Sequence, residues 1–115
     1  MPDPLLALDD DAQAPALPDP AAMAGAATEA AAFLKALSHE GRLMILCHLS
    51  TGEKSVTELE RLLDQRQAAV SQQLARLRLE GLVACRRDGK AIFYAIRDPR
   101  VSRLIGTLHD MFCAA

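Results

Sequence analysis

Apolar residues recur along the chain with a helical period in five segments and with a strand period in two. Residues 21–36 read AAMAGAATEAAAFLKA, an Ala-rich run that favours a helix. A second helix is expected from a cap at Ser38 to about Leu49, with Glu40 in its first turn. Its apolar positions wrap widely around the helix, so we expect it to be buried on most sides.

The middle of the chain predicts two short helices separated by a tight turn. Ser55 can cap the first helix, and Glu58 occupies the matching capping-box position. A break at residues 64–66 precedes a second helix over residues 67–80, whose apolar side chains fall on one face. Gly81 follows at the position where a left-handed residue is wanted, so we expect the helix to end there.

The segment LVACRRDGKAIFYAI predicts a β-hairpin. Two alternating runs flank Asp88-Gly89, the strongest short-range signal for a two-residue turn. Asp98 then caps and Pro99 opens a last helix, whose apolar stripe reaches the end of the sequence. The predicted order is ααααββα, a mainly helical fold with one small β-hairpin, forming a single domain over residues 21–115.

Charge is distributed unevenly along the chain, although the net charge is only −2. Residues 1–20 contain five Asp, no Lys or Arg and no periodic apolar pattern, so we expect a disordered acidic tail. Residues 61–103 contain ten Lys or Arg against four acids. A basic half is compatible with a nucleic-acid partner, but a solvated face has the same composition, so charge alone does not decide.

The sequence also limits the compartment in which the protein works. No apolar run approaches the roughly 20 residues of a membrane span, and no basic-then-apolar segment marks a secretory signal. Three cysteines are too few and too scattered for a secreted disulfide scaffold. We therefore expect a soluble cytoplasmic protein with reduced thiols, no cofactor and no membrane partner.

Two short helices joined by a tight turn, the second with small polar side chains outward, are typical of a helix-turn-helix. Gln67, Ser71 and Gln72 can meet base edges, and Arg66 and Arg76 can meet phosphates or guanine. These five residues are the predicted reading surface for double-stranded DNA.

The basic tip of the predicted hairpin adds a second, independent mark of a DNA-binding protein. Arg86, Arg87 and Lys90 crowd this tip, as expected of a wing that lies along the DNA backbone or minor groove. Together, the helix pair and the basic hairpin favour a winged helix-turn-helix over a merely solvated polar face.

Four blocks of the sequence resemble the ArsR/SmtB family of winged-helix repressors. They read LKALSHEGRLMILCHL, SVTELERLL, QAAVSQQLARLRLEGLV and RRDGKAIFYAI, within a resemblance that covers residues 31–113. The resemblance implies a homodimer, formed through the first and last helices, that binds a pseudo-palindromic operator. It implies base readout by Gln67, Ser71 and Gln72 and backbone contacts by Arg86, Arg87 and Lys90.

Cys47 and Cys113 are placed like the sensing pair of the persulfide-responsive branch of that family, the BigR- and SqrR-type repressors. The resemblance implies that the reduced dimer holds DNA. Reactive sulfur species then bridge the two cysteines of a subunit through extra sulfur atoms, and the operator is released. Considered alone, Cys47 is better explained as a small buried hydrophobe. Cys85, on a wing strand, lies outside the family pair, and we expect it to be filler.

Three other functions remain as alternatives: a metal-sensing repressor, a general peroxide-sensing repressor and a small thiol enzyme. The segment VTELERLL lacks the cysteines of one family metal site. The last helix keeps Asp98 of another, but Arg100 and Met111 occupy its other ligand positions. Cys47 and His48 are adjacent, so they point about 100° apart on a helix and converge poorly on a metal. The thiol enzyme is disfavoured because a complete wing is present and a Gly-rich anion cradle is absent.

Overall fold

The computed structural model describes residues 17–113, and the chain divides into two units after Ala31. The described part of the first unit is a short lead-in and the N-terminal portion of helix α2 (Pro20–Leu37). Most of the predicted acidic tail, residues 1–16, lies outside the described residues. The second unit, residues 32–115, holds the remaining elements and the hydrophobic core.

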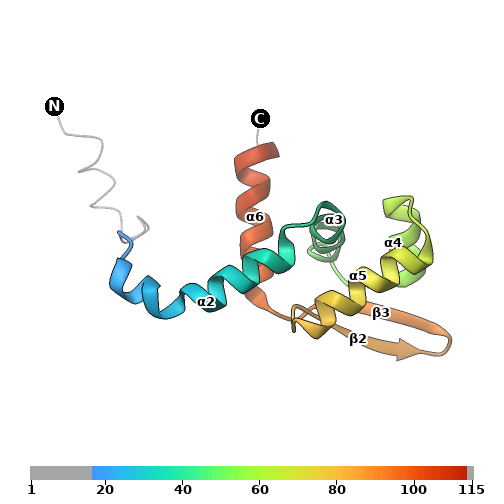
Figure 1. The fold of residues 1–115 in the computed structure, drawn as a ribbon. Helices are drawn as coiled ribbons and strands as arrows, with labels where there is room; N and C mark the ends of the chain where they lie inside the picture. Colours follow the sequence, from blue (N-terminus) through green and yellow to red (C-terminus); the bar gives the residue numbers. More distant parts are fainter. Residues whose placement is uncertain (1–16, 114–115) are drawn as a thin grey trace. The chain divides into compact units, whose positions relative to one another are not determined.

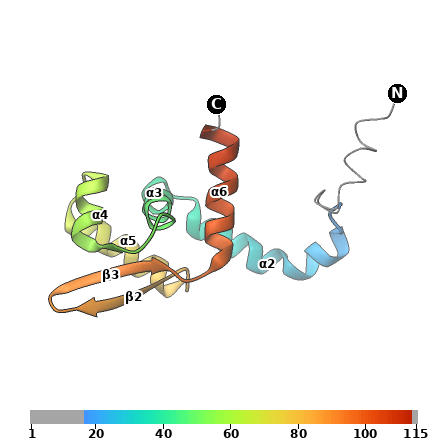
Figure 2. The same cartoon turned by 180° about the vertical axis from the view of Figure 1, so that it is seen from behind.

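The second unit has the predicted order of helices and strands, with one additional short strand. Its elements after α2 are α3 (Glu40–Leu49), β1 (Lys54–Ser55), α4 (Val56–Leu63), α5 (Gln67–Leu79), β2 (Val83–Asp88), β3 (Ala91–Ile96) and α6 (Pro99–Cys113). In Figures 1 and 2, α3 lies between α6 on one side and the α4–α5 pair on the other. The hairpin of β2 and β3 runs along the α4–α5 side, where β2 contacts α5 and β3 contacts α4.

The core is a continuous cluster of aliphatic side chains contributed by every helix and by strand β2. The completely enclosed side chains are Ile45, Leu46, Leu59, Val70, Leu74, Leu77, Val83 and Val101. Three of these, Val70, Leu74 and Leu77, form the predicted apolar face of α5. Burying that face stabilises the fold by roughly 25 cal/mol per Å² and fixes which side of α5 points outward.

Helix α3 is buried on most sides, as its sequence predicted. Ile45, Leu46 and Leu49 are buried, and Leu43 and Cys47 are partly buried against the core. Met44, at 41% exposure, lies on the open side of the helix.

Local capping signals define the ends of most helices. The capping box of α4 is confirmed: Glu58 N donates to Ser55 Oγ (3.0 Å) and Ser55 N donates to Glu58 Oε1 (2.9 Å). Gly81 has the predicted left-handed conformation, with φ +78°. The predicted cap at Asp98 is also confirmed, because Arg100 N donates to Asp98 Oδ1 at 2.9 Å.

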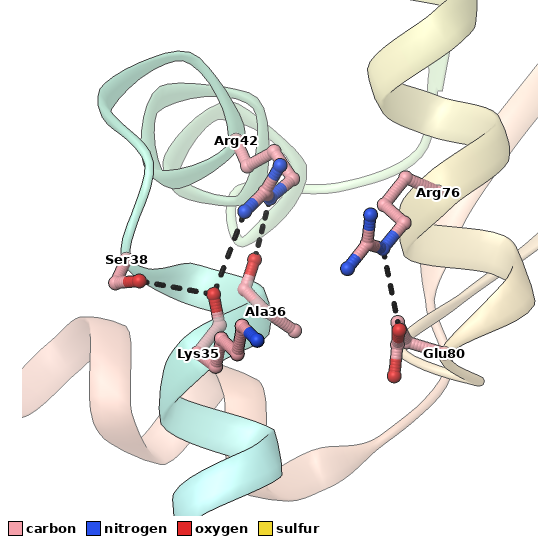
Figure 3. A network of polar contacts seen from close by, with 6 residues as sticks. All are labelled: Lys35, Ala36, Ser38, Arg42, Arg76 and Glu80. Atoms are coloured by element: carbon pink, nitrogen blue, oxygen red, sulfur yellow. Dashed lines mark hydrogen bonds and ion pairs between the residues drawn. The ribbon is translucent and has the colours of Figure 1, made fainter.

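The predicted cap of α3 was wrong by one residue. His39 is the cap, and its Nδ1 accepts hydrogen bonds from Gly41 N and Arg42 N. Ser38 Oγ donates instead to Lys35 O, at the end of α2 (Figure 3). The turn between α2 and α3 is so short that Ser38 lies beside the unpaired carbonyls that end α2, where a donor is needed.

The sheet has the strand order β1-β3-β2, and all its pairs are antiparallel. Strand β1 was missed because two residues cannot show an alternating pattern. The hairpin was predicted, but its turn lies one residue later than expected. Asp88 pairs with Ala91, so Gly89 and Lys90 are the central turn residues. Gly89 has φ +63° and Lys90 does not have a positive φ, as in a type II′ turn, which requires glycine at its first central position.

Candidate DNA interface and thiol pair

Helices α4 and α5 form the predicted helix-turn-helix, with Asp64 in a left-handed conformation (φ 53°) at the end of α4. This residue turns the chain sharply, so α5 begins only three residues later. Asp and Asn adopt this conformation more readily than other non-glycine residues, because their short side chains bond locally. The turn sequence therefore fixes where the second helix starts.

The predicted reading surface lies on the side of α5 away from the core, or at its edge. Gln67 and Gln72 are exposed, and Ser71 is half-buried. Arg66 is exposed at the cap position of α5, where it makes no side-chain capping bond. Arg76 is exposed and pairs with Glu80 at 3.3 Å one helical turn later (Figure 3). An exposed pair of this kind contributes little to stability, so it leaves Arg76 available to other anions.

The wing presents its three predicted cations in two different ways. Arg87 and Lys90 are exposed, and neither side chain has a hydrogen-bond or ion-pair partner within residues 17–113. The Arg86 side chain is 52% exposed, but it is paired with Glu53: its Nε donates to Glu53 Oε2 (2.8 Å) and its Nη2 to Glu53 Oε1 (2.7 Å). The guanidinium also lies 4.6 Å from the ring centroid of Phe93.

The Arg86–Glu53 pair perturbs both charged groups. The hydrogen bonds from Arg86 hold the pKa of the Glu53 carboxyl below its usual value, and the same bonds raise the pKa of the guanidinium. Sequence reasoning missed Glu53 and Phe93 because the three residues come from separate segments. Only the pairing of the strands brings them together.

Cys47 and Cys113 line one pocket, although they lie far apart in the sequence. Helix α3 packs against α6, and the pocket between them has a volume of about 230 Å³. Its lining residues are Leu43, Met44, Cys47, Ile105, Leu108, His109, Phe112 and Cys113. Cys47 is half-buried and Cys113 exposed, and both are free thiols. The pocket walls are almost wholly apolar, so a charged species is poorly solvated inside it.

Cys85 is not part of this arrangement. It is half-buried on β2, directly opposite Tyr94 of β3. Burial raises the pKa of the Tyr94 hydroxyl, and the neighbouring Cys85 thiol adds to this shift. Cys85 is therefore a packing neighbour of Tyr94, away from the pocket of Cys47 and Cys113.

A larger depression of about 730 Å³ lies between α3 and the α4–α5 pair. Gln73 of α5 contributes to its wall, and its Oε1 is buried without a hydrogen-bond partner among the described residues. A Cβ atom on Gly41 of α3 would lie 2.6 Å from that Oε1. The sequence could not predict this close approach of α3 to α5, because a lone glycine in a helix does not indicate which residue packs against it.

Two negative findings concern residues 17–113 only. No group of three or more His, Cys, Asp or Glu within that range could hold a metal ion. No helix in the same range is both long enough and apolar enough to cross a membrane.

Comparisons with known proteins agree with this architecture. Residues 39–84 match the model of the arsR family of bacterial regulatory proteins. A curated relative, the biofilm growth-associated repressor of Agrobacterium fabrum, is 50% identical over 93 residues, which cover 81% of this chain and 80% of that protein.

Solved structures give the same result for the fold. The transcriptional repressor BigR from Xylella fastidiosa superposes with a TM-score of 0.82 at 42% identity, over 85% of this chain and 100% of that chain. Reduced HlyU from Vibrio cholerae superposes with a TM-score of 0.75 at 41% identity, over 79% and 96% of the two chains. The predicted winged helix-turn-helix is therefore confirmed. The chain belongs to the ArsR family of DNA-binding transcriptional regulators, and it is a regulator rather than an enzyme.

Proposed function

We propose that this protein is a cytoplasmic transcriptional repressor that releases its operator when reactive sulfur species bridge Cys47 and Cys113. The observation that carries the proposal is that both thiols line one apolar pocket, between α3 and α6. Proximity matters because the second sulfur–sulfur bond closes within one subunit, so no second protein molecule has to be found. The repressor function is supported by the relatives from Agrobacterium and Xylella, whose names describe them as repressors.

The proposed chemistry starts with one thiolate attacking the outer sulfur of a low-molecular-weight hydropersulfide, RSSH. The thiolate becomes a protein persulfide, and RS⁻ leaves and takes up a proton as RSH. The other cysteine reacts in the same way. One persulfide anion then attacks the inner sulfur of the other persulfide and expels hydrosulfide. The net change converts two thiols and two RSSH into a trisulfide bridge, two RSH and one H₂S. The two protein thiols together lose two electrons, which reduce one sulfane sulfur to H₂S, and the other sulfane sulfur stays in the bridge.

The apolar wall of the pocket suits the sulfur atoms of the proposed bridge. A neutral trisulfide is a soft, weakly hydrated group, and a pocket without polar lining does not penalise it as it penalises ions. Each inserted sulfur also adds about 2 Å of reach, so a trisulfide tolerates a wider separation of the two helices than a disulfide does.

Release of DNA follows from where the two cysteines lie. In the proposed homodimer, α2 and α6 form the interface, and the exposed Met111 and Phe112 of α6 are covered by the second subunit. A bridge that draws α6 toward α3 repacks that interface and changes the separation of the two α5 helices. The half-site spacing of a pseudo-palindrome is fixed by the DNA helical turn, so a shift of a few Å costs specific binding.

On the DNA side, Gln67, Ser71 and Gln72 would read bases, with Arg66 and Arg76 on phosphate or guanine. This assignment rests on their exposure along the outer side of α5 and at its start. Arg87 and Lys90 would hold the backbone from the wing.

The test uses a 30-base-pair duplex selected from a randomised pool with the reduced protein. Its affinity is measured by fluorescence anisotropy before and after treatment with glutathione persulfide, hydrogen peroxide or Zn²⁺. Glutathione persulfide is expected to weaken binding at least tenfold, equal to about 1.4 kcal/mol. Intact mass should show one sulfur gained and two hydrogens lost in each subunit. Cys47→Ser and Cys113→Ser should each abolish the response, and Cys85→Ser is the matched control that keeps it.

Each other outcome overturns a defined part of the proposal. Full persulfide response in Cys47→Ser would exclude the dithiol bridge. Equal release by peroxide would make the protein a general redox sensor, and release by Zn²⁺ alone would make it a metal sensor. Failure to select any duplex at moderate salt would remove the repressor function itself.

A further inference from the structure

Arg86 was expected to contact the DNA backbone, but its exposed side chain already pairs with Glu53 and lies over the ring of Phe93. Two parallel hydrogen bonds join its guanidinium to the carboxylate of Glu53, at 2.8 and 2.7 Å. Such bidentate pairs are the most directional of charged contacts, because the planar fork of arginine matches both carboxylate oxygens. The Phe93 ring lies against the same guanidinium, 4.6 Å away.

The register of the sheet explains why these groups meet. Arg86 of β2 is directly opposite Phe93 of β3, and Phe93 is directly opposite Ser55 of β1. Opposed residues point to the same face of a sheet, and so do residues two apart in one extended segment. Glu53, two residues before Ser55 and just outside β1, brings its carboxylate to this face, where it accepts both hydrogen bonds from Arg86. The arginine reaches from the edge strand, across the central strand, to the segment leading into β1.

We propose that Glu53 and Arg86 form a clamp across the sheet that sets the position of the wing. Arg86 is then a positioning residue, and the phosphate contacts of the wing belong to Arg87 and Lys90. This inference rests on the geometry of the sheet and is independent of the thiols, so it goes beyond the sulfur response.

The sheet needs such a clamp because of its size. A two-stranded hairpin is marginally stable by itself, and here the third strand, β1, contributes only two residues. The two ladder pairs of β1 connect only Lys54 and Ser55 to β3. The clamp adds a connection between the wing and Glu53, in the segment that follows α3. Arginine suits this role because its guanidinium lies flat on an aromatic ring while its donors point to a carboxylate.

The clamp also sets how much positive charge the wing offers to DNA. The Glu53 carboxylate neutralises Arg86, and Asp88 lies 3.9 Å from the same guanidinium. Arg87 and Lys90 have no such partners within residues 17–113. A residue that neutralises a phosphate releases a counterion and adds about 0.9 to the slope of log affinity against log salt, whereas a positioning residue adds nothing.

The experiment measures affinity for the selected 30-base-pair duplex at several salt concentrations, using the full-length reduced protein. Arg87→Gln should weaken binding and reduce the salt slope by about 0.9. Arg86→Gln should weaken binding several-fold with the slope unchanged. Glu53→Gln should also weaken binding, although it removes a negative charge. Asp88→Asn, which removes an acid from the same wing, is the matched control for that charge.

A charge-reversed pair gives the decisive comparison. Arg86→Glu alone should weaken binding strongly, and adding Glu53→Arg should restore most of the affinity, because the clamp is rebuilt with its polarity reversed. Amide hydrogen exchange on the free protein should show faster exchange in β3 for Glu53→Gln and Arg86→Gln than for the wild type.

Three results would overturn the clamp. They are a salt slope reduced by about 0.9 in Arg86→Gln, tighter binding by Glu53→Gln than by Asp88→Asn, and no recovery in the charge-reversed protein. The persulfide response of the same variants separates this inference from the proposed function. Each clamp variant should keep the fold-change in affinity that persulfide produces in the wild type.

Discussion

Gly41, in the first turn of α3, lies directly against the side-chain amide of Gln73 on α5. A Cβ atom at position 41 would lie 2.6 Å from Gln73 Oε1 and 2.8 Å from Nε2, distances that real Cβ atoms essentially never show. The absence of a side chain on Gly41 therefore leaves the space that this amide occupies. The contact joins the helix that carries Cys47 to the helix predicted to read DNA.

This contact predicts that substitutions at positions 41 and 73 are not additive. Gly41→Ala gains up to about 1 kcal/mol of helix propensity, but it has to displace the Gln73 amide. In a Gln73→Ala background the clash is gone, and the gain should appear in full. Urea unfolding of the four proteins in this cycle should give a coupling of about 0.5–1 kcal/mol. Additive free energies of unfolding would show that the amide moves away without cost.

Asp98 should stabilise α6 both as a cap and as an ion-pair partner. Asp98→Ala removes the acceptor for Arg100 N and should lower the free energy of unfolding by about 1 kcal/mol. Asp98→Asn keeps a capping oxygen and removes only the charge, so it should cost less. Urea unfolding of the three proteins at pH 7 ranks them. Equal loss in both variants would mean that the charge, and not the cap, carries the effect.

The pH dependence at Asp98 has a definite sign. The hydrogen bonds from Arg100 hold its pKa below the usual value, so the folded protein binds this proton less readily than the unfolded chain. The contribution is present above about pH 4, the ordinary pKa of Asp, and is lost as the pH falls through the lower folded value. Wild type and Asp98→Asn should therefore differ most in melting temperature at neutral pH and converge below pH 4. A difference that grows in acid would contradict this assignment.

Residues that read bases and residues that hold phosphates should respond differently to the DNA sequence. Gln72→Ala should weaken binding to the selected duplex by about 1–3 kcal/mol and leave binding to a scrambled duplex almost unchanged. Arg76→Gln should weaken both by the same factor if it contacts phosphate. Anisotropy titrations with the two duplexes measure this ratio. A uniform loss in Gln72→Ala would remove it from the reading surface.

The outer face of α6 should control the oligomeric state. Met111 is 67% exposed although it lies on an apolar stripe, and it does not line the thiol pocket. Met111→Lys should shift the protein from dimer to monomer in sedimentation velocity, because it places a charge in the proposed interface. Leu79→Lys, at a residue 83% exposed near the end of α5, is the control that should stay dimeric. A dimeric Met111→Lys protein would place the interface elsewhere.

Local sequence patterns were sufficient for most of the fold. The cap at Ser55, the left-handed Gly81 and the buried face of α5 each depend on residues a few positions apart, and all were confirmed. The cap of α3 and the hairpin turn were each predicted one residue too early, because in both places two adjacent residues could serve the same role. The short turn after α2 decides the first case, and the strand register decides the second.

Contacts between distant segments were beyond the reach of those patterns. Nothing in the composition of residues 50–56 pairs Glu53 with Arg86, because β1 is too short to show a period. Cys47 and Cys113 were paired through family resemblance, and their shared pocket is consistent with that pairing. Spacing alone left Cys47 indistinguishable from a core residue.

Cys113 is the last helical residue of α6, and this position has a kinetic consequence. The final turn of a helix lacks partners for its carbonyl groups and opens at little cost. Helix ends open and close on a timescale of about 0.1–1 μs, whereas thiol exchange takes seconds or longer. In the proposed mechanism, Cys113 would therefore sample its open and closed arrangements many times before a sulfur–sulfur bond forms. In the proposed mechanism, sulfur chemistry would then set how long the operator stays occupied after a sulfur pulse, and substitutions that stiffen this last turn would tune the rate of derepression through its closed fraction.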